Sequence, residues 1–238
     1  MFKPDRTTLL NSLIFPVSFT ALLWLVKIIE TLLKLDIVTL GIFPLKLSGL
    51  IGILTAPLIH SGIHHLLSNT VGVFLLSWAL FYFYREIALW SFILIYFLSG
   101  FWVWFFARDA FHIGASGLIY GMASFLFFSG IFRRFAPLIA VSLTIVFLYG
   151  GIIWGIFPTI EKISWETHLT GLLAGIIVAI YYKNEGPQKP HIPDDDEDDD
   201  LTFDELFTED EKYTPPVPEN KNNPTVNWHY KKDDNTVE

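Results

Sequence analysis

The chain has 238 residues, of which 52% are hydrophobic, 16% are aromatic and only 17% are charged, a composition that excludes an ordinary water-soluble domain and predicts a multi-pass membrane protein. The net charge of -8 comes chiefly from an acidic run at residues 194–200, so it does not indicate a nucleic-acid partner, and we expect none. Cysteine is absent, which excludes disulfides, a thiol nucleophile and a cysteine metal site.

Six apolar stretches predict membrane-spanning helices, because a span needs roughly 20 mainly apolar residues. In chain order they lie near residues 13–33, 64–84, 87–106, 116–132, 136–157 and 166–182. The first stretch is too long for the apolar core of a signal peptide and lacks the small-residue exit, so we interpret it as a retained helix.

Residues 35–63, between the first two spans, are apolar but interrupted by glycine and proline. Such a pattern resists one straight helix, and we expect a long loop that lies in the membrane interface. A seventh span in part of this segment is the alternative.

Lysine and arginine in the short connections indicate the orientation, since cytoplasmic loops are enriched in both. One side of the predicted bundle carries Lys3, Arg6, Arg85, Arg133, Arg134 and Lys183, and the other carries the fewer and more scattered Lys34, Lys46, Arg108 and Lys162. We therefore expect an integral protein of the plasma membrane with both termini in the cytoplasm. Ser116 then opens the fourth span from the external side.

The composition changes after Tyr182 to proline, acidic residues, asparagine and lysine. We expect residues 1–184 to form the membrane domain and residues 185–238 to form a disordered, acidic cytoplasmic tail. Within the tail, the apolar residues of 201–207 are spaced for one face of a short helix, which could dock a cytosolic partner. A tail that is solvated throughout is the alternative.

Ser116 lies between small residues in Gly114-Ala-Ser-Gly117, where the fourth apolar stretch begins. Glycine lets the backbone approach a substrate closely, and the start of a helix has unpaired N–H groups that can stabilise an oxyanion. The alternative for Ser116 is a plain helix N-cap. At roughly 25 Å of helix, the fourth span begins below the external surface, so we expect residues 107–115 to be irregular and to line a wet cavity.

His168 begins the sixth span and is followed by Gly171 and Gly175. With Gly117 and Gly121 in the fourth span, these glycines predict two helices whose backbones lie close together, which puts His168 within reach of Ser116. A serine beside an imidazole is the minimum equipment for acyl transfer. No acidic residue is placed to orient the histidine, so we expect a Ser-His dyad.

His65 and Asn69 lie four residues apart in the second span and therefore share a helix face. A polar residue inside an apolar run marks either a functional site or a hydrogen bond between helices, and both interpretations remain open here. His60 and His64 are interpreted as interfacial or interhelical histidines.

These motifs together resemble the rhomboid family of intramembrane serine proteases. The motifs that carry the resemblance, over roughly residues 10–183, are Gly114-Ala-Ser116-Gly117, His65 with Asn69, and His168 with Gly171 and Gly175. The resemblance implies an all-α bundle of six transmembrane helices. It also implies a serine endopeptidase that cleaves transmembrane protein substrates within the lipid bilayer.

By this resemblance Ser116 is the nucleophile and His168 is the general base and acid, and no cofactor or metal is needed. His65, Asn69 and the backbone N–H of Ser116 would form the oxyanion hole, and Tyr120 would pack against the histidine. The first external loop departs from the family because it lacks the usual Trp-Arg pair.

Two other functions remain as alternatives. A catalytically silent rhomboid-like protein could bind transmembrane clients, although Ser116 and His168 are both present. A transporter of small solutes would call for repeated broken helices or several carboxylates inside the spans.

Overall fold

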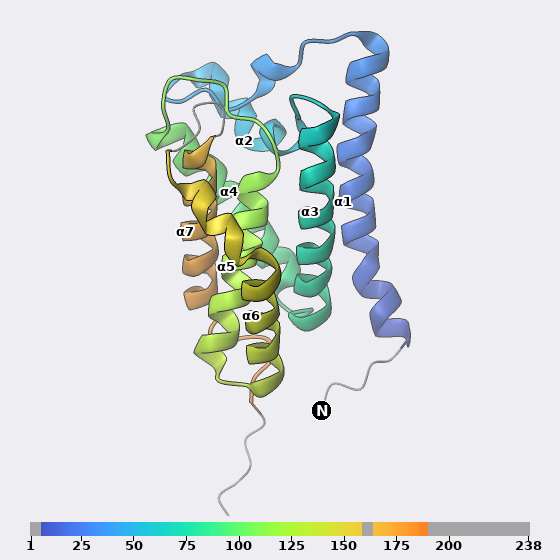
Figure 1. The fold of residues 1–238 in the computed structure, drawn as a ribbon, viewed down its shortest axis with the longest axis vertical. Helices are drawn as coiled ribbons and strands as arrows, with labels where there is room; N and C mark the ends of the chain where they lie inside the picture. The colour runs from blue at the N-terminus through green and yellow to red at the C-terminus, as the bar shows by residue number, and fades with distance from the viewer. Residues whose placement is uncertain (1–5, 159–163, 190–238) are drawn as a thin grey trace, which may run out of the picture. The chain divides into compact units, whose positions relative to one another are not determined.

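A computed structural model describes residues 6–158 and 164–189 of the chain, and these residues form an all-helical unit (Figure 1). Its α-helices are α1 (Arg6–Leu33), α2 (Gly52–Thr55), α3 (Ile63–Phe83), α4 (Ala88–Phe106), α5 (Ser116–Arg133), α6 (Ala136–Tyr149) and α7 (Trp165–Tyr181). Of these, α1, α3, α4 and α5 are long and apolar enough to cross a membrane, and α6 and α7 are apolar but shorter. The predicted all-α membrane fold is confirmed, whereas the count of six spans stays a prediction. The acidic tail, including residues 201–207, lies outside the described residues.

The fifth predicted span, residues 136–157, is not one continuous α-helix. α6 ends at Tyr149, and the chain continues as a 3-10 helix over Gly150–Ile156. Gly150 and Gly151 follow Tyr149 directly, and glycine is a poor residue for the interior of an α-helix. The last turns therefore tighten, which brings the 3-10 helix toward the start of α7.

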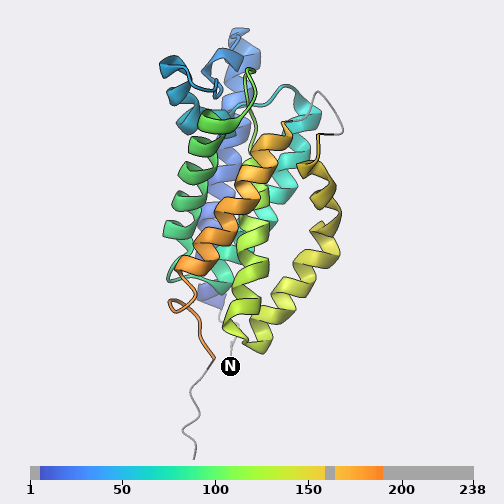
Figure 2. The same cartoon turned by 90° about the vertical axis from the view of Figure 1, so that its left-hand side faces the viewer.

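Residues 35–63 are irregular, as predicted. They contain α2 and three short 3-10 helices, Val38–Leu40, Leu47–Ile51 and Ala56–Leu58. Figures 1 and 2 show this segment lying across the end of the bundle where α3 and α7 begin. The backbone of residues 41–43 packs directly on Gly49 and Gly52, where a Cβ atom would collide with it. The close contact explains why glycine interrupts the apolar run.

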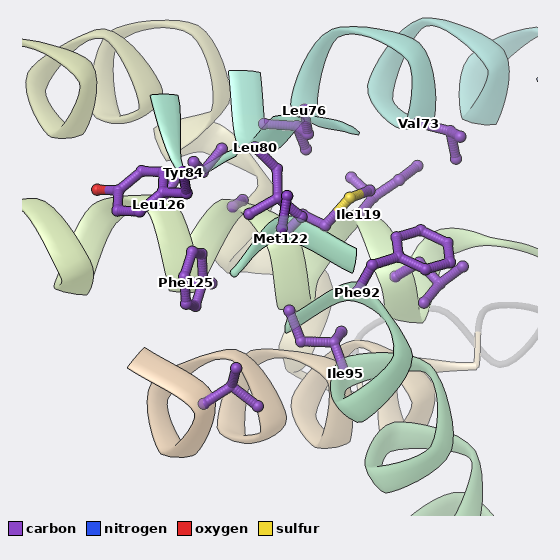
Figure 3. Close-up of a cluster of buried hydrophobic side chains, with 14 of the residues drawn as sticks. Val73, Leu76, Leu80, Tyr84, Phe92, Ile95, Ile119, Met122, Phe125 and Leu126 are labelled. Atoms are coloured by element: carbon purple, nitrogen blue, oxygen red, sulfur yellow. The ribbon is translucent and has the colours of Figure 1, made fainter. Parts of the chain in front are cut away.

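α5 is the centre of the unit, since α3, α4, α6 and α7 all pack around it. The core between them is apolar, and Figure 3 shows Leu76 and Leu80 of α3 and Ile95 of α4 beside Met122 and Phe125 of α5. Because lipid provides little hydrophobic driving force between helices, close van der Waals packing must hold such a bundle together.

The contact between α5 and α7 is made through glycine. A Cβ atom on Gly171 would collide with the carbonyl group of Gly117, and one on Gly175 would collide with the carbonyl group of Gly121. The two helices can therefore lie this close only while these positions carry no side chain. Their approach sets the distance between the first turns of α5 and α7, where Ser116 and His168 lie.

Candidate active site

Ser116 is the first residue of α5, and the cap position before it is occupied by Ala115. The preceding segment, residues 107–115, is irregular, as predicted. Within it Gly114 has a φ of +104°, a backbone conformation that L side chains rarely adopt. The N–H of Gly114 donates to the carbonyl of Ala56 at 2.8 Å, which fixes the turn against the segment that precedes α3. Ser116 thus stands at a sharp entry into a buried helix.

The hydroxyl oxygen of Ser116 lies 2.9 Å from Nε2 of His168. The other ring nitrogen, Nδ1, lies 2.9 Å from the carbonyl oxygen of Gly155 in the 3-10 helix after α6. Because a carbonyl only accepts hydrogen bonds, Nδ1 carries the proton of the neutral ring and donates it to Gly155. Nε2 then accepts from the Ser116 hydroxyl, which is the arrangement that a general base requires.

The ring of Tyr120 stacks on the ring of His168, with centroids 4.3 Å apart and planes 6° from parallel. Tyr120 lies one helical turn after Ser116, so α5 supplies both the candidate nucleophile and the ring against which the histidine packs. The imidazole is held by three contacts: a stacked ring, a backbone acceptor and the serine.

His65 and Asn69 both face the turn before Ser116. A Cβ atom on Gly114 would lie 2.7 Å from Nε2 of His65 and 3.6 Å from Nδ2 of Asn69. Asn69 is only 4% exposed, and its Nδ2 has no hydrogen-bond partner among residues 6–158 and 164–189. A buried donor without a partner is costly, which indicates a place where an acceptor binds.

A second set of polar residues ties the loop before Ser116 to the turn before His168. Nδ1 of the buried His112 forms a short hydrogen bond with the hydroxyl of Ser164, and its Nε2 donates to the carbonyl of Arg108 at 3.0 Å. Ser164 in turn lies 2.6 Å from the hydroxyl of Thr167. Burial lowers the pKa of His112, although its hydrogen bond to Arg108 opposes this, so the ring is neutral at pH 7. A neutral ring fits these partners.

Glu166 is the acidic residue nearest to His168 in the sequence, but its carboxylate pairs with Arg108 at 3.5 Å. No hydrogen bond joins it to His168 among the described contacts. The sequence offered no acid to orient the histidine, and in the structure a backbone carbonyl takes that place.

Two partners of the histidines were not predicted from the sequence. One is the carbonyl of Gly155, which contacts His168, and the other is Ser61, whose hydroxyl lies 3.2 Å from Nδ1 of His65. Ser61 could have been found, because it lies four residues before His65. The carbonyl of Gly155 left no signal in the sequence, since every residue carries one.

Two apolar grooves flank α6. The larger, of about 690 Å³, is lined mainly by α3 and α6, including Leu75, Trp78, Val141 and Leu148. The smaller, of about 280 Å³, is lined by α5, α6 and the start of the 3-10 helix, and it reaches Tyr120. Figure 2 shows α6 beside α5 at the edge of the bundle, and its main helix contact is with α5.

A family model described as "Rhomboid domain" matches residues 48–185. An uncharacterized protein of Mycobacterium tuberculosis is 36% identical over 171 residues, which cover 68% of this chain and 71% of that protein. An uncharacterized protein of Mycobacterium leprae is 32% identical over 171 residues, which cover 68% of each chain.

Proposed function

This chain belongs to the rhomboid family, and from that membership and the geometry around Ser116 we propose that it is an intramembrane serine endopeptidase that cleaves transmembrane protein substrates. The observation that carries the proposal is the 2.9 Å contact between the Ser116 hydroxyl and Nε2 of His168. An imidazole whose other nitrogen is held by a backbone carbonyl is ready to accept the serine proton.

In the first half of the reaction the Ser116 oxygen attacks the scissile carbonyl carbon while its proton passes to Nε2 of His168. The imidazolium that forms keeps its Nδ1 hydrogen bond to Gly155. When the tetrahedral intermediate collapses, the C–N bond breaks and His168 gives the proton to the leaving amine. The acyl group remains on Ser116 as an ester.

In the second half a water molecule attacks the ester carbonyl and gives its proton to His168. Collapse of the second tetrahedral intermediate returns the proton to the Ser116 oxygen and releases the new carboxyl terminus. The same residue therefore serves as base and then as acid in each half.

Negative charge develops on the carbonyl oxygen in both halves. We assign its stabilisation to the backbone N–H of Ser116, Nδ2 of Asn69 and Nε2 of His65. The unpaired, buried amide of Asn69 supports this role, since an oxyanion beside Gly114 would give it an acceptor.

The larger groove between α3 and α6 is where the transmembrane segment of a substrate would dock. Its lining is almost wholly apolar, which fits a helix that lies in lipid and excludes a charged peptide. α6 borders both grooves, and the smaller one leads to Tyr120 beside His168. A substrate unwinding along α6 would bring its backbone toward Ser116.

We assign the protein to the plasma membrane, and the excess of lysine and arginine on one side of the spans supports cytoplasmic termini and an external active site. The second candidate function, binding of transmembrane clients without cleavage, would use the same apolar groove.

Cleavage of a single-span test substrate by the purified full chain in liposomes separates the two functions. We expect cleavage by the wild type and none by Ser116→Ala, with both proteins inserted and folded. Equal cleavage by both would exclude Ser116 as the nucleophile, and capture of the substrate without cleavage by either would favour the binding function.

A further inference from the structure

Lys27 and Glu30 are two charged residues inside α1, the longest apolar helix, and their side chains are only 11% and 15% exposed. A charge within a spanning helix is costly and by default marks a functional contact. Nζ of Lys27 lies 3.0 Å from the Glu30 carboxylate and 2.9 Å from the carbonyl oxygen of His60. Lys27 lies before the segment that matches the family model, and its partner His60 lies within that segment.

The carbonyl that Lys27 holds lies in the short connection between the 3-10 helix Ala56–Leu58 and α3. The 3-10 helix directly before this connection contacts the turn before Ser116, since the carbonyl of Ala56 accepts the N–H of Gly114. The His60 side chain is 1% exposed, and its ring meets the ring of His65 edge to face, with centroids 5.0 Å apart. Lys27 thus fixes a connection that contacts one of the proposed oxyanion donors.

Ser61 follows directly, and its hydroxyl lies 3.2 Å from Nδ1 of His65. His65 can donate to an oxyanion from Nε2 only if Nε2 carries the ring proton. In a neutral ring Nδ1 is then an acceptor, and the Ser61 hydroxyl is placed to donate to it. Nε2 is the nitrogen that faces Gly114. A donating hydroxyl at this place stabilises the tautomer that leaves the proton on Nε2.

We propose that Lys27 and Ser61 are positioning residues of the oxyanion hole: Lys27 anchors the connection before α3 to α1, and Ser61, held in place by that anchor, keeps His65 protonated at Nε2. The assignment rests on the proposed function for its catalytic consequence. The tautomer itself does not depend on proteolysis.

The first readout is nitrogen NMR of the full chain labelled with ¹⁵N-histidine, with the His65 signals identified from their loss in His65→Ala. The wild type should show a neutral His65 ring protonated at Nε2, and Ser61→Ala should shift it toward a mixture of tautomers. Ser61→Thr, which keeps the hydroxyl, should restore the wild-type signal. A wild-type ring protonated at Nδ1, or a signal unmoved by Ser61→Ala, overturns the proposal even if the protein has no protease activity.

The second readout is turnover of a single-span substrate. Ser61→Ala should lower kcat by roughly 5- to 10-fold, the effect of one hydrogen bond, with KM unchanged. The loss should vanish when His65 is already alanine, since the two residues act as a unit. Ser68→Ala is the matched control, because the Ser68 hydroxyl donates to the backbone carbonyl of His65 and not to its ring. An equal loss on the His65→Ala background would contradict the positioning role.

To test Lys27, Glu30 is replaced at the same time, so that neither charge of the ion pair is left without its partner. The double variant Lys27→Met, Glu30→Gln should reproduce both the tautomer shift and the fall in kcat, and its thermal unfolding shows whether it is folded. Lys27→Arg, which keeps a charged donor, should retain the wild-type tautomer. A folded double variant with the wild-type tautomer and wild-type kcat would overturn the role of Lys27.

Discussion

The carbonyl oxygen of Gly155 lies 2.9 Å from Nδ1 of His168, so a backbone group holds the imidazole that faces Ser116. Gly155 has no room for a side chain, because a Cβ atom would collide with the Tyr120 hydroxyl and lie 3.0 Å from Nδ1 of His168. The end of α6 and its 3-10 extension therefore form part of the proposed catalytic site. The proposed general base therefore depends on a 3-10 helix that lines the smaller apolar groove.

Gly155→Ala should lower kcat by roughly 10- to 100-fold, a part of what a well-placed general base contributes. Gly151→Ala is the matched control, since a Cβ atom there meets open space in the same 3-10 helix. Steady-state cleavage of a single-span substrate measures both variants. Equal effects from the two substitutions would show that the contact with His168 has no special importance.

Asn69→Ala and His65→Ala should each lower kcat by roughly 10²- to 10³-fold with little change in KM, if both donate to the oxyanion. A hydrogen bond that only holds membrane helices together averages about 0.6 kcal/mol, so its loss would appear as modest destabilisation with turnover preserved. Turnover and thermal unfolding are measured together. A variant that melts early yet cleaves at nearly the wild-type rate has lost a packing contact and not a catalytic one.

The two donors can compensate for each other, so the double variant Asn69→Ala, His65→Ala completes that measurement. A double variant that still turns over at nearly the wild-type rate would exclude both residues from the oxyanion hole.

Stability should fall as the pH drops from about 6.5 to about 4. Burial lowers the pKa of His60 from its usual 6.5 to about 4, and the positive charge that His65 can carry nearby lowers it in the same direction. Between these values the unfolded chain binds a proton that the folded chain does not, so acid favours unfolding by up to about 3 kcal/mol. Above pH 6.5 this contribution is constant.

Thermal unfolding across this pH range, compared between the wild type and His60→Gln, isolates the contribution of His60 from that of the other histidines. The glutamine variant should lose less stability on acidification, because its side chain has no proton to gain. If the stability of the two proteins fell equally with pH, the pKa of His60 would not differ between the folded and the unfolded chain.

Truncation after Lys189 should leave proteolysis within about 2-fold of the full chain, since the tail is expected to be a solvated appendage. Truncation after Asn184 should lower thermal stability, because the buried Arg133 donates to the carbonyl of Glu185 at 2.9 Å. Lost activity with unchanged melting in the Lys189 truncation would place the tail in the mechanism.

The pairing of Ser116 with His168 could be anticipated because it depends on residue types that are visible in the sequence. Two helices can lie close together where glycines face each other, as Gly117 and Gly121 face Gly171 and Gly175. This close contact brings the first turns of the two helices together, and with them Ser116 and His168. The irregular course of residues 35–63 could also be predicted, since the glycines and prolines in this segment disfavour one continuous helix.

The partners of the two histidines were harder to anticipate. Gly155 acts through its backbone, and its place depends on the change from α-helix to 3-10 helix after Tyr149, which the apolar sequence through residue 157 conceals. The contact of Lys27 joins residues 33 positions apart, so no local pattern predicts it. A lysine and a glutamate three residues apart inside an apolar span were nevertheless a signal in the sequence.

Reaction of the purified protein with a fluorophosphonate probe, followed by mapping of the labelled residue, tests the central claim most directly. We predict one labelled residue, Ser116, with labelling lost in Ser116→Ala and strongly reduced in His168→Ala, because the probe reports a serine activated by its imidazole. Ser124→Ala should label normally, since the Ser124 hydroxyl is engaged with the carbonyls of Gly121 and Leu172. Labelling of a serine other than Ser116, or labelling of Ser116 that is indifferent to the loss of His168, would contradict the proposed mechanism.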